Sequence, residues 1–134
     1  MKAEVKALAR HRISRAHEAF AEGDYLLTKG SLTGAVNRFY YAGFYAARAL
    51  LATKEIDSSR HSGVISLFQK HFVITDQVSQ AHAKALPRSF EKRQNTDYAD
   101  FVTIAPEEAR SVREDIRAFL EECTELLERL LAVE

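Results

Sequence analysis

The sequence predicts an all-α protein, built as an antiparallel up-and-down bundle of four long helices with one short extra helix. Apolar residues recur at steps of three and four along most of the 134 residues, which is the spacing of a helix with one buried face. The chain has only five glycines and two prolines, and no segment alternates as a half-buried strand does. The length predicts one domain, residues 1–134, with one core.

The first two predicted helices cover about residues 2–28 and 32–53. Gly30 can take a positive φ after the first helix, and Ser31 or Thr33 can cap the second. The second helix is apolar on most sides, so we expect it at the centre of the bundle or at a subunit interface. Small residues on it would let another helix approach closely: Ala42, Gly43, Ala46 and Ala47.

Three further helices complete the prediction. The third covers about residues 59–72, and the fourth runs from about 75 to 94 with Pro87 inside it, which should kink or split it. The segment 101–104 is interpreted as an extended connector. The fifth helix begins at Pro106, with Glu107 and Glu108 placed to favour the helix dipole. Cys123 lies on its apolar stripe and is expected to be a small buried residue.

Charge and composition limit the classes of function. Lys plus Arg and Asp plus Glu both number 19, so no overall basic field indicates nucleic acid. A local basic run, Lys84, Arg88, Lys92 and Arg93, is either a solvated helix face or an anion-binding surface. No apolar run is long enough for a membrane span, and the charged N-terminus does not resemble a signal peptide. With a single cysteine, a cytoplasmic protein is the expectation.

Common catalytic motifs are missing from the sequence. It contains no phosphate-binding glycine loop, no HExxH and no Gly-x-Ser-x-Gly. The histidines do not have the spacing of metal ligands on a helix, and we predict neither a metal nor a cofactor. The histidines are His11, His17, His61, His71 and His82.

The remaining candidate site is the polar segment FEKRQNTDYADF, residues 90–101. Asp97 follows Arg93 by four residues, so an ion pair is expected, and Asn95 and Thr96 can end a helix through local hydrogen bonds. The segment is either a helix end followed by a turn, with Tyr98 packing its ring, or a binding site. A guanidinium beside an amide, a hydroxyl, a carboxylate and a phenol is suited to phosphate or ribose.

Three motifs, in this order and at suitable distances, resemble HEPN-domain proteins: NRFYYAGFYAARALL at 37–51, RHSGVISLF at 60–68 and RQNTDY at 93–98. More narrowly, the chain is similar to the small stand-alone prokaryotic HEPN proteins of the UPF0332 group over about residues 10–130. The resemblance implies a bundle of four to five helices, commonly a homodimer. It also implies frequent pairing with a minimal nucleotidyltransferase, often as a toxin–antitoxin pair.

The chain departs from the pattern of active HEPN ribonucleases, which cleave RNA without metal through an Arg-x4–6-His motif. Arg93 matches the arginine, but Tyr98 stands where the histidine would be, and no histidine follows Arg93. A tyrosine titrates near 10 and is a poor base at neutral pH. Related toxins can carry a tyrosine two residues after the histidine, which the partner modifies with AMP; here that residue is Asp100. His61, inside the second motif, either joins Arg93 in a cleft or is a packing residue.

Three hypotheses follow, in order of preference. The first is a homodimeric binding module that acts with a nucleotidyltransferase and holds a nucleotide or an RNA phosphate. The second is a toxin-type ribonuclease that uses Arg93 with His61 or Tyr98. The third is a structural helical adaptor without a ligand. The residues predicted to bind the ligand are Lys92, Arg93, Asn95, Asp97, Tyr98, Tyr40 and Tyr41.

Overall fold

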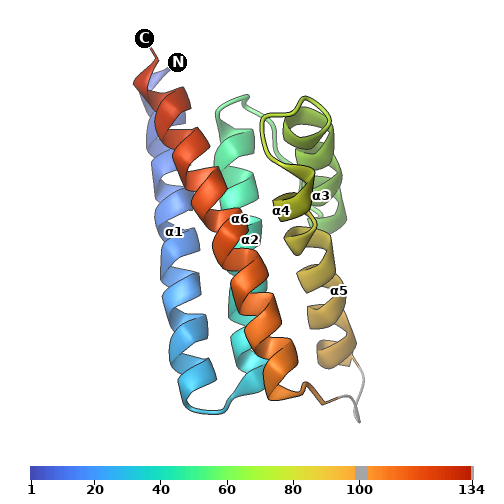
Figure 1. The fold of residues 1–134 in the computed structure, drawn as a ribbon. Coiled ribbons are helices and arrows are strands. Elements are labelled where there is room, and N and C mark those ends of the chain that lie inside the picture. Colours follow the sequence, from blue (N-terminus) through green and yellow to red (C-terminus); the bar gives the residue numbers. More distant parts are fainter. Residues whose placement is uncertain (99–102, 134) are drawn as a thin grey trace.

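The computed structural model describes residues 1–98 and 103–133, with the side chain of Tyr98 outside that description. Figure 1 shows α1, α2, α5 and α6 running alternately up and down, with α3 beside them and both termini at one end. The described residues contain no strand, so the predicted all-α bundle is confirmed. The helices are α1 (Ala3–Thr28), α2 (Leu32–Ala52), α3 (His61–Phe68), α4 (Gln80–Ala83), α5 (Ala85–Tyr98) and α6 (Pro106–Ala132), and the π-helical turn η1 (Gln69–Val73) continues α3.

Helix α2 lies at the centre of the bundle, as its apolar sequence predicts. It contacts α1, α3, α5 and α6. Glycines allow two of these contacts to be close: a Cβ on Gly23 would lie 2.6 Å from Phe39 Cε1, and one on Gly43 would lie 2.9 Å from Ile116 Cδ1. The side chains of Phe39 and Ile116 are fully buried. The packing therefore fixes α1 and α6 against α2, and with them the positions of the side chains on its outer face.

The breaks between helices follow the predicted signals. Gly30 has a φ of 78°, as expected after α1. Ser31 occupies the position before α2, but its side chain makes no capping hydrogen bond, so that part of the prediction is wrong. The predicted fourth helix is split into α4 and α5 at Lys84. Pro87 has no N–H to donate to the carbonyl four residues earlier, at Ala83, where the break falls.

The end of α5 differs from the prediction. We expected Asn95 and Thr96 to end the helix near residue 94, but α5 continues to Tyr98. The Thr96 hydroxyl donates to the Arg93 carbonyl at 3.0 Å, a bond that is compatible with a helix. Asp97 lies one turn beyond Arg93 and pairs with it. Residues 90–98 of the polar segment are therefore the last turns of a helix, and residues 99–101 lie outside the described residues. The connector predicted at 101–104 also lies partly outside them.

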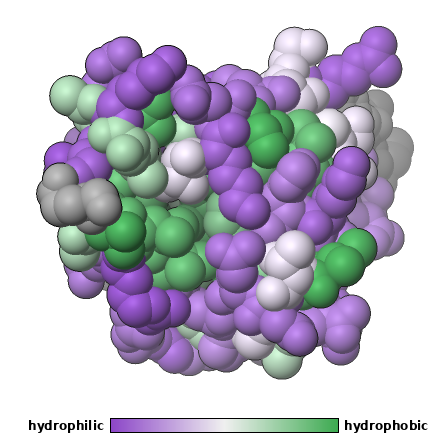
Figure 2. All heavy atoms as spheres, turned by 90° about the horizontal axis from the view of Figure 1, so that it is seen from above, coloured by the Kyte–Doolittle hydropathy of each residue, from purple (hydrophilic) through white to green (hydrophobic). Residues whose placement is uncertain are grey.

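Helix α6 carries the predicted apolar stripe, with small corrections near its end. Cys123 is fully buried, and burial raises the pKa of its thiol. Leu131 is buried, whereas Leu130, which is seven residues after Cys123 and so on the same predicted stripe, is only partly buried. Figure 2 views the end that carries both termini, where hydrophobic residues gather among hydrophilic ones. Met1 and Val133 belong to this end and are at least half exposed. Within the described residues, no helix has the length and apolar character to cross a membrane.

Candidate functional site

Helices α2, α3 and α5 bring six side chains together, which we call the Arg93 cluster. Helix α2 contributes three rings within two turns, α3 contributes the histidine at its first residue, and α5 contributes a ring and an arginine three residues apart. Successive ring centroids lie within about 6 Å of one another, so the cluster is continuous. Its members are Tyr40, Tyr41, Phe44, His61, Phe90 and Arg93.

His61 is held in the cluster by a hydrogen bond and a ring stack. Its Nδ1 lies 2.6 Å from the hydroxyl of Tyr40, and its ring stacks on Phe44 at 4.2 Å. Burial, then the charges of Arg93 and Arg48, lower the pKa of His61 below 6.5, so the imidazole is neutral at pH 7. Burial chiefly raises the pKa of the Tyr40 phenol, which therefore keeps its proton. The distance fits two tautomers: a phenol that donates to Nδ1 leaves the imidazole proton on Nε2, and an Nδ1–H that donates to the phenol oxygen leaves Nε2 without a proton.

Arg93 places its guanidinium against two tyrosine rings. Its Cζ lies 5.5 Å from the centroid of Tyr40 and 5.2 Å from that of Tyr41, within the range of cation–π contact. The side chain is only 16% exposed. Asp97 Oδ2 is 3.2 Å from Arg93 Nε, yet this buried Nε makes no aligned hydrogen bond. The guanidinium is thus held by aromatic rings and one carboxylate and keeps a donor unused.

The structure brings together only part of the predicted site. Arg93, Asp97, His61, Tyr40 and Tyr41 lie in or beside the Arg93 cluster. The prediction for Tyr98 lies outside the described side chains, and with it the proposal that Tyr98 replaces the catalytic histidine. His61 belongs to the same cluster as Arg93, but it is also hydrogen-bonded to Tyr40 and stacked on Phe44, so both interpretations of this residue, the cleft and the packing one, stay predictions.

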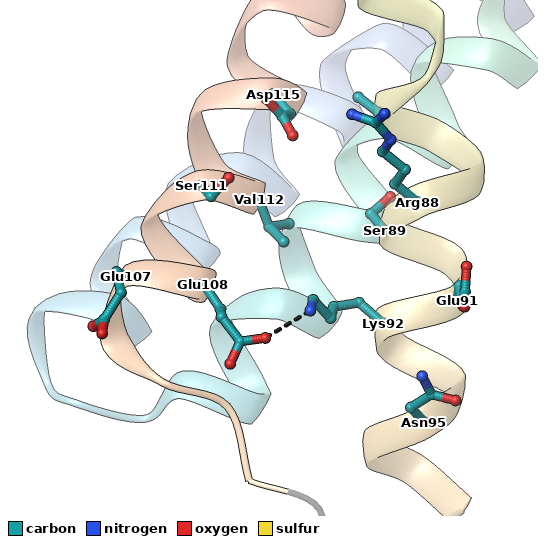
Figure 3. Close-up of a pocket in the computed structure, with 11 residues that line it drawn as sticks. Arg88, Ser89, Glu91, Lys92, Asn95, Glu107, Glu108, Ser111, Val112 and Asp115 are labelled. Carbon is teal, nitrogen blue, oxygen red and sulfur yellow. Dashed lines mark hydrogen bonds and ion pairs between the residues drawn. The ribbon is translucent and has the colours of Figure 1, made fainter.

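Lys92 and Asn95 lie elsewhere, on the wall of a cleft between α5 and α6 with a volume of about 490 Å³. Figure 3 shows Lys92 reaching across this cleft, where its Nζ donates to Glu108 Oε2 at 2.6 Å. Arg88 also reaches from α5 towards α6, which presents Asp115. Two members of the predicted basic run, Arg88 and Lys92, therefore face carboxylates on α6, whereas Arg93 faces the rings of α2, so the run does not form one basic surface. The structure does not bring Lys92 and Asn95 together with Arg93.

An arginine–tyrosine row on α2 was missed by the sequence analysis. Arg38 stands on the turn of α2 before Tyr41, and its Cζ lies 5.3 Å from the centroid of the Tyr41 ring. Arg15 of α1 lies 4.9 Å from the centroid of Tyr45, and its Nη2 donates to the Tyr45 hydroxyl at 3.2 Å. The spacing of Arg38, Tyr41, Tyr45 and Arg48 by three, four and three is the signal that could have found the row.

The arginine row ends at the loop between α2 and α3, where Asp57 binds two arginines. Its Oδ2 accepts from Arg48 at 2.8 Å and from Arg12 at 3.1 Å. The hydrogen bond from Arg48 is the main reason that the pKa of Asp57 is lowered, with burial opposing it. Arg12 also donates to the Arg48 carbonyl at 3.2 Å. The Arg48 end of the row is therefore satisfied within the chain, whereas at the other end the buried Nε of Arg38 has no hydrogen-bond partner.

These observations define a class: an all-α bundle whose central helix presents tyrosines to arginines of neighbouring helices, beside a neutral histidine. The HEPN domain model matches residues 9–127. A UPF0332 protein of Thermotoga maritima is 37% identical over 116 residues, which are 87% of this chain and 88% of that protein. Two candidate toxins of Methanocaldococcus jannaschii are 31% identical over 130 residues (96% and 92%) and 34% identical over 97 residues (72% and 66%). The chain belongs to the HEPN domain family, and the resemblance seen in its motifs is confirmed.

Proposed function

We propose that this HEPN protein is a binding module that holds a phosphate group of a nucleotide or of RNA at Arg93. The observation that carries the proposal is the state of that guanidinium. It is largely buried, stacked on Tyr40 and Tyr41, and has a buried Nε without an aligned acceptor. An unused buried donor costs free energy, and a phosphate oxygen would remove that cost. Phosphate also suits the planar, permanently charged arginine.

Binding of adenosine monophosphate and of a short single-stranded RNA, measured by calorimetry or anisotropy, tests this function. Arg93→Gln should weaken binding about tenfold, because it removes a charge-assisted hydrogen bond. The matched control is Arg88→Gln, which removes the same charge from the same helix outside the Arg93 cluster. Equal affinity of wild type and Arg93→Gln, with both folded by circular dichroism, would reject the proposal. Loss of affinity in the control alone would move the site to the α5–α6 cleft.

The biological setting in this proposal is a toxin–antitoxin-like pair with a minimal nucleotidyltransferase. The support is the HEPN family membership and the similarity to two candidate toxins. A nucleotidyltransferase gene beside this one, and co-purification of the two products, is the expected result. A homodimer is also proposed, and its mass in solution by light scattering tests it. A monomer at all concentrations would remove the dimer from the proposal and leave phosphate binding unaffected.

A second candidate function, metal-independent cleavage of RNA, is favoured by one observation. His61 is neutral, lies in the same cluster as Arg93, and is oriented by the Tyr40 hydroxyl at 2.6 Å. In the tautomer whose Nδ1–H donates to the Tyr40 oxygen, Nε2 of the neutral imidazole is free to accept a proton, while the arginine stabilises charge on a phosphate. RNA degradation in EDTA that is abolished by both Arg93→Gln and His61→Asn would establish this function. If the protein binds RNA and the RNA stays intact, the ribonuclease function is rejected and the binding module remains.

A further inference from the structure

Two arginines from different helices lie against the ring of Tyr41. Arg38 Cζ is 5.3 Å and Arg93 Cζ 5.2 Å from the ring centroid, so the two guanidinium carbons are no further apart than the sum of these distances. Arg38 stands one turn before Tyr41 on α2, and Arg93 comes from the last turns of α5. Two like charges are therefore held near each other around a single aromatic ring.

The two arginines are also alike in what they lack. Each has one carboxylate partner: Arg38 Nη2 lies 3.2 Å from Glu22 Oε1, and Arg93 Nε lies 3.2 Å from Asp97 Oδ2. Arg38 Nε and Arg93 Nε are the buried side-chain nitrogen or oxygen atoms without a hydrogen-bond partner within the residues that the structure describes. Buried polar atoms in folded proteins are nearly always paired, so both exceptions occurring beside one ring call for a common explanation.

We infer that Arg38 is a second anion-binding residue and that the ligand carries two phosphate groups, one bound at Arg38 and the other at Arg93. This inference rests on the function proposed for Arg93. The carboxylate of Glu22 is 60% exposed, and an exposed ion pair is worth little, so a phosphate can replace it. Arginine binds phosphate through its planar fork of donors, and the Tyr41 ring restricts both guanidinium groups to the site.

Two sources supply two neighbouring phosphates: the pyrophosphate of a nucleoside diphosphate and the successive phosphates of a single-stranded nucleic acid. The binding experiment compares ligands with one phosphate, AMP and ApA, with ligands that carry two, ADP and the 5′-phosphorylated dinucleotide pApA. We expect wild type to bind at least one two-phosphate ligand about tenfold more tightly than its one-phosphate counterpart. Preference for ADP assigns the pyrophosphate, and preference for pApA assigns the nucleic-acid strand.

Variants of the arginine and its partner make the test specific. Arg38→Gln should weaken the two-phosphate ligand about tenfold while changing AMP by less than about threefold. Arg38→Lys keeps the charge but loses the planar fork of donors, so its affinity for the two-phosphate ligand should lie between that of wild type and that of Arg38→Gln. Glu22→Gln releases Arg38 and should strengthen two-phosphate binding by up to about fivefold. Arg88→Gln, with the same change of charge outside the site, should leave the preference for two phosphates unchanged.

Three results would overturn the inference. Equal affinity for AMP, ADP and pApA in wild type, with AMP binding lost in Arg93→Gln, would leave the proposed function standing and reject the second phosphate. An equal loss of one- and two-phosphate ligands in Arg38→Gln would make Arg38 a general contributor to charge. No binding of any of these ligands by the folded wild type would reject both the proposed function and the inference drawn from it.

Discussion

The hydrogen bond between Tyr40 and His61 supports a quantitative prediction, because one atom can be removed without a change of shape. Tyr40 is fully buried, and its hydroxyl lies 2.6 Å from His61 Nδ1. Tyr40→Phe deletes this hydroxyl and leaves the imidazole nitrogen without its partner, which costs about 1–2 kcal/mol of unfolding free energy. For a chain of this length that corresponds to a fall in Tm of about 3–7 °C. The control is Tyr45→Phe, which removes a hydroxyl that accepts an exposed hydrogen bond from Arg15. It should change the free energy of unfolding by less than about 0.5 kcal/mol.

The same variant should also change the titration of His61. Burial, then the charges of Arg93 and Arg48, lower the pKa of His61. A phenol that donates to Nδ1 adds a preference for the neutral imidazole, so its removal in Tyr40→Phe should raise that pKa part of the way towards 6.5. A histidine whose folded pKa is lowered costs stability as the pH falls from 6.5 through the folded pKa, because the unfolded chain binds the proton first. The pH dependence in this window should be weaker in Tyr40→Phe. The reasoning would be refuted if the Tm of Tyr40→Phe lay within about 1 °C of that of wild type and the NMR titration of His61 were unchanged.

Two further predictions concern the bundle itself. Gly23→Ala should lower the free energy of unfolding, measured by urea denaturation, by a net amount of about 1–2 kcal/mol. Its Cβ would lie 2.6 Å from the buried ring of Phe39, and the better helix propensity of alanine offsets only about 1 kcal/mol. A variant as stable as wild type would contradict the close packing of α1 on α2. Asp57→Asn should cost about 1 kcal/mol at pH 7, discounted for its exposure, because Arg12 and Arg48 lose their carboxylate. The folded pKa of Asp57 is lowered from 3.8, so its contribution to stability is present above pH 3.8 and is lost as the pH falls through the folded pKa. The unfolding free energies of wild type and Asp57→Asn should therefore converge in acid. A difference in unfolding free energy that stays constant with pH would be the contrary result.

The bundle was predictable because its signals are local. The 3.6-residue period, Gly30 after α1 and Pro87 inside the fourth segment are each read within a few residues, and each acts within a few residues in the fold. The end of α5 was not predictable in the same way. Asn95 and Thr96 favour helix ends on average, yet here the Thr96 hydroxyl donates to the Arg93 carbonyl within the helix, and the charge of Asp97 lies one turn from that of Arg93.

That error also explains why the predicted site was only partly brought together. Residues adjacent in a turn can surround one ligand, whereas Lys92 and Arg93, adjacent in a helix, point about 100° apart. Lys92 therefore meets Glu108 of α6, while Arg93 meets the rings of α2. Arg38 was missed for another reason. Its contact with Tyr41 is local, but its relation to Arg93 depends on how α5 packs on α2, which the spacing of residues along the chain does not specify.

The placement of the tyrosines has a consequence for how the site can be observed. The chain contains no tryptophan and five tyrosines, so its near-ultraviolet absorption, fluorescence and dichroism come mainly from tyrosine. Tyr40 and Tyr41 are adjacent on α2, Tyr45 stands on the next turn, and each of the three rings lies against an arginine. A ligand that repositions Arg38 or Arg93 changes the surroundings of these chromophores directly. The native protein thus carries its own optical probe of the site, and a titration can be followed without a label.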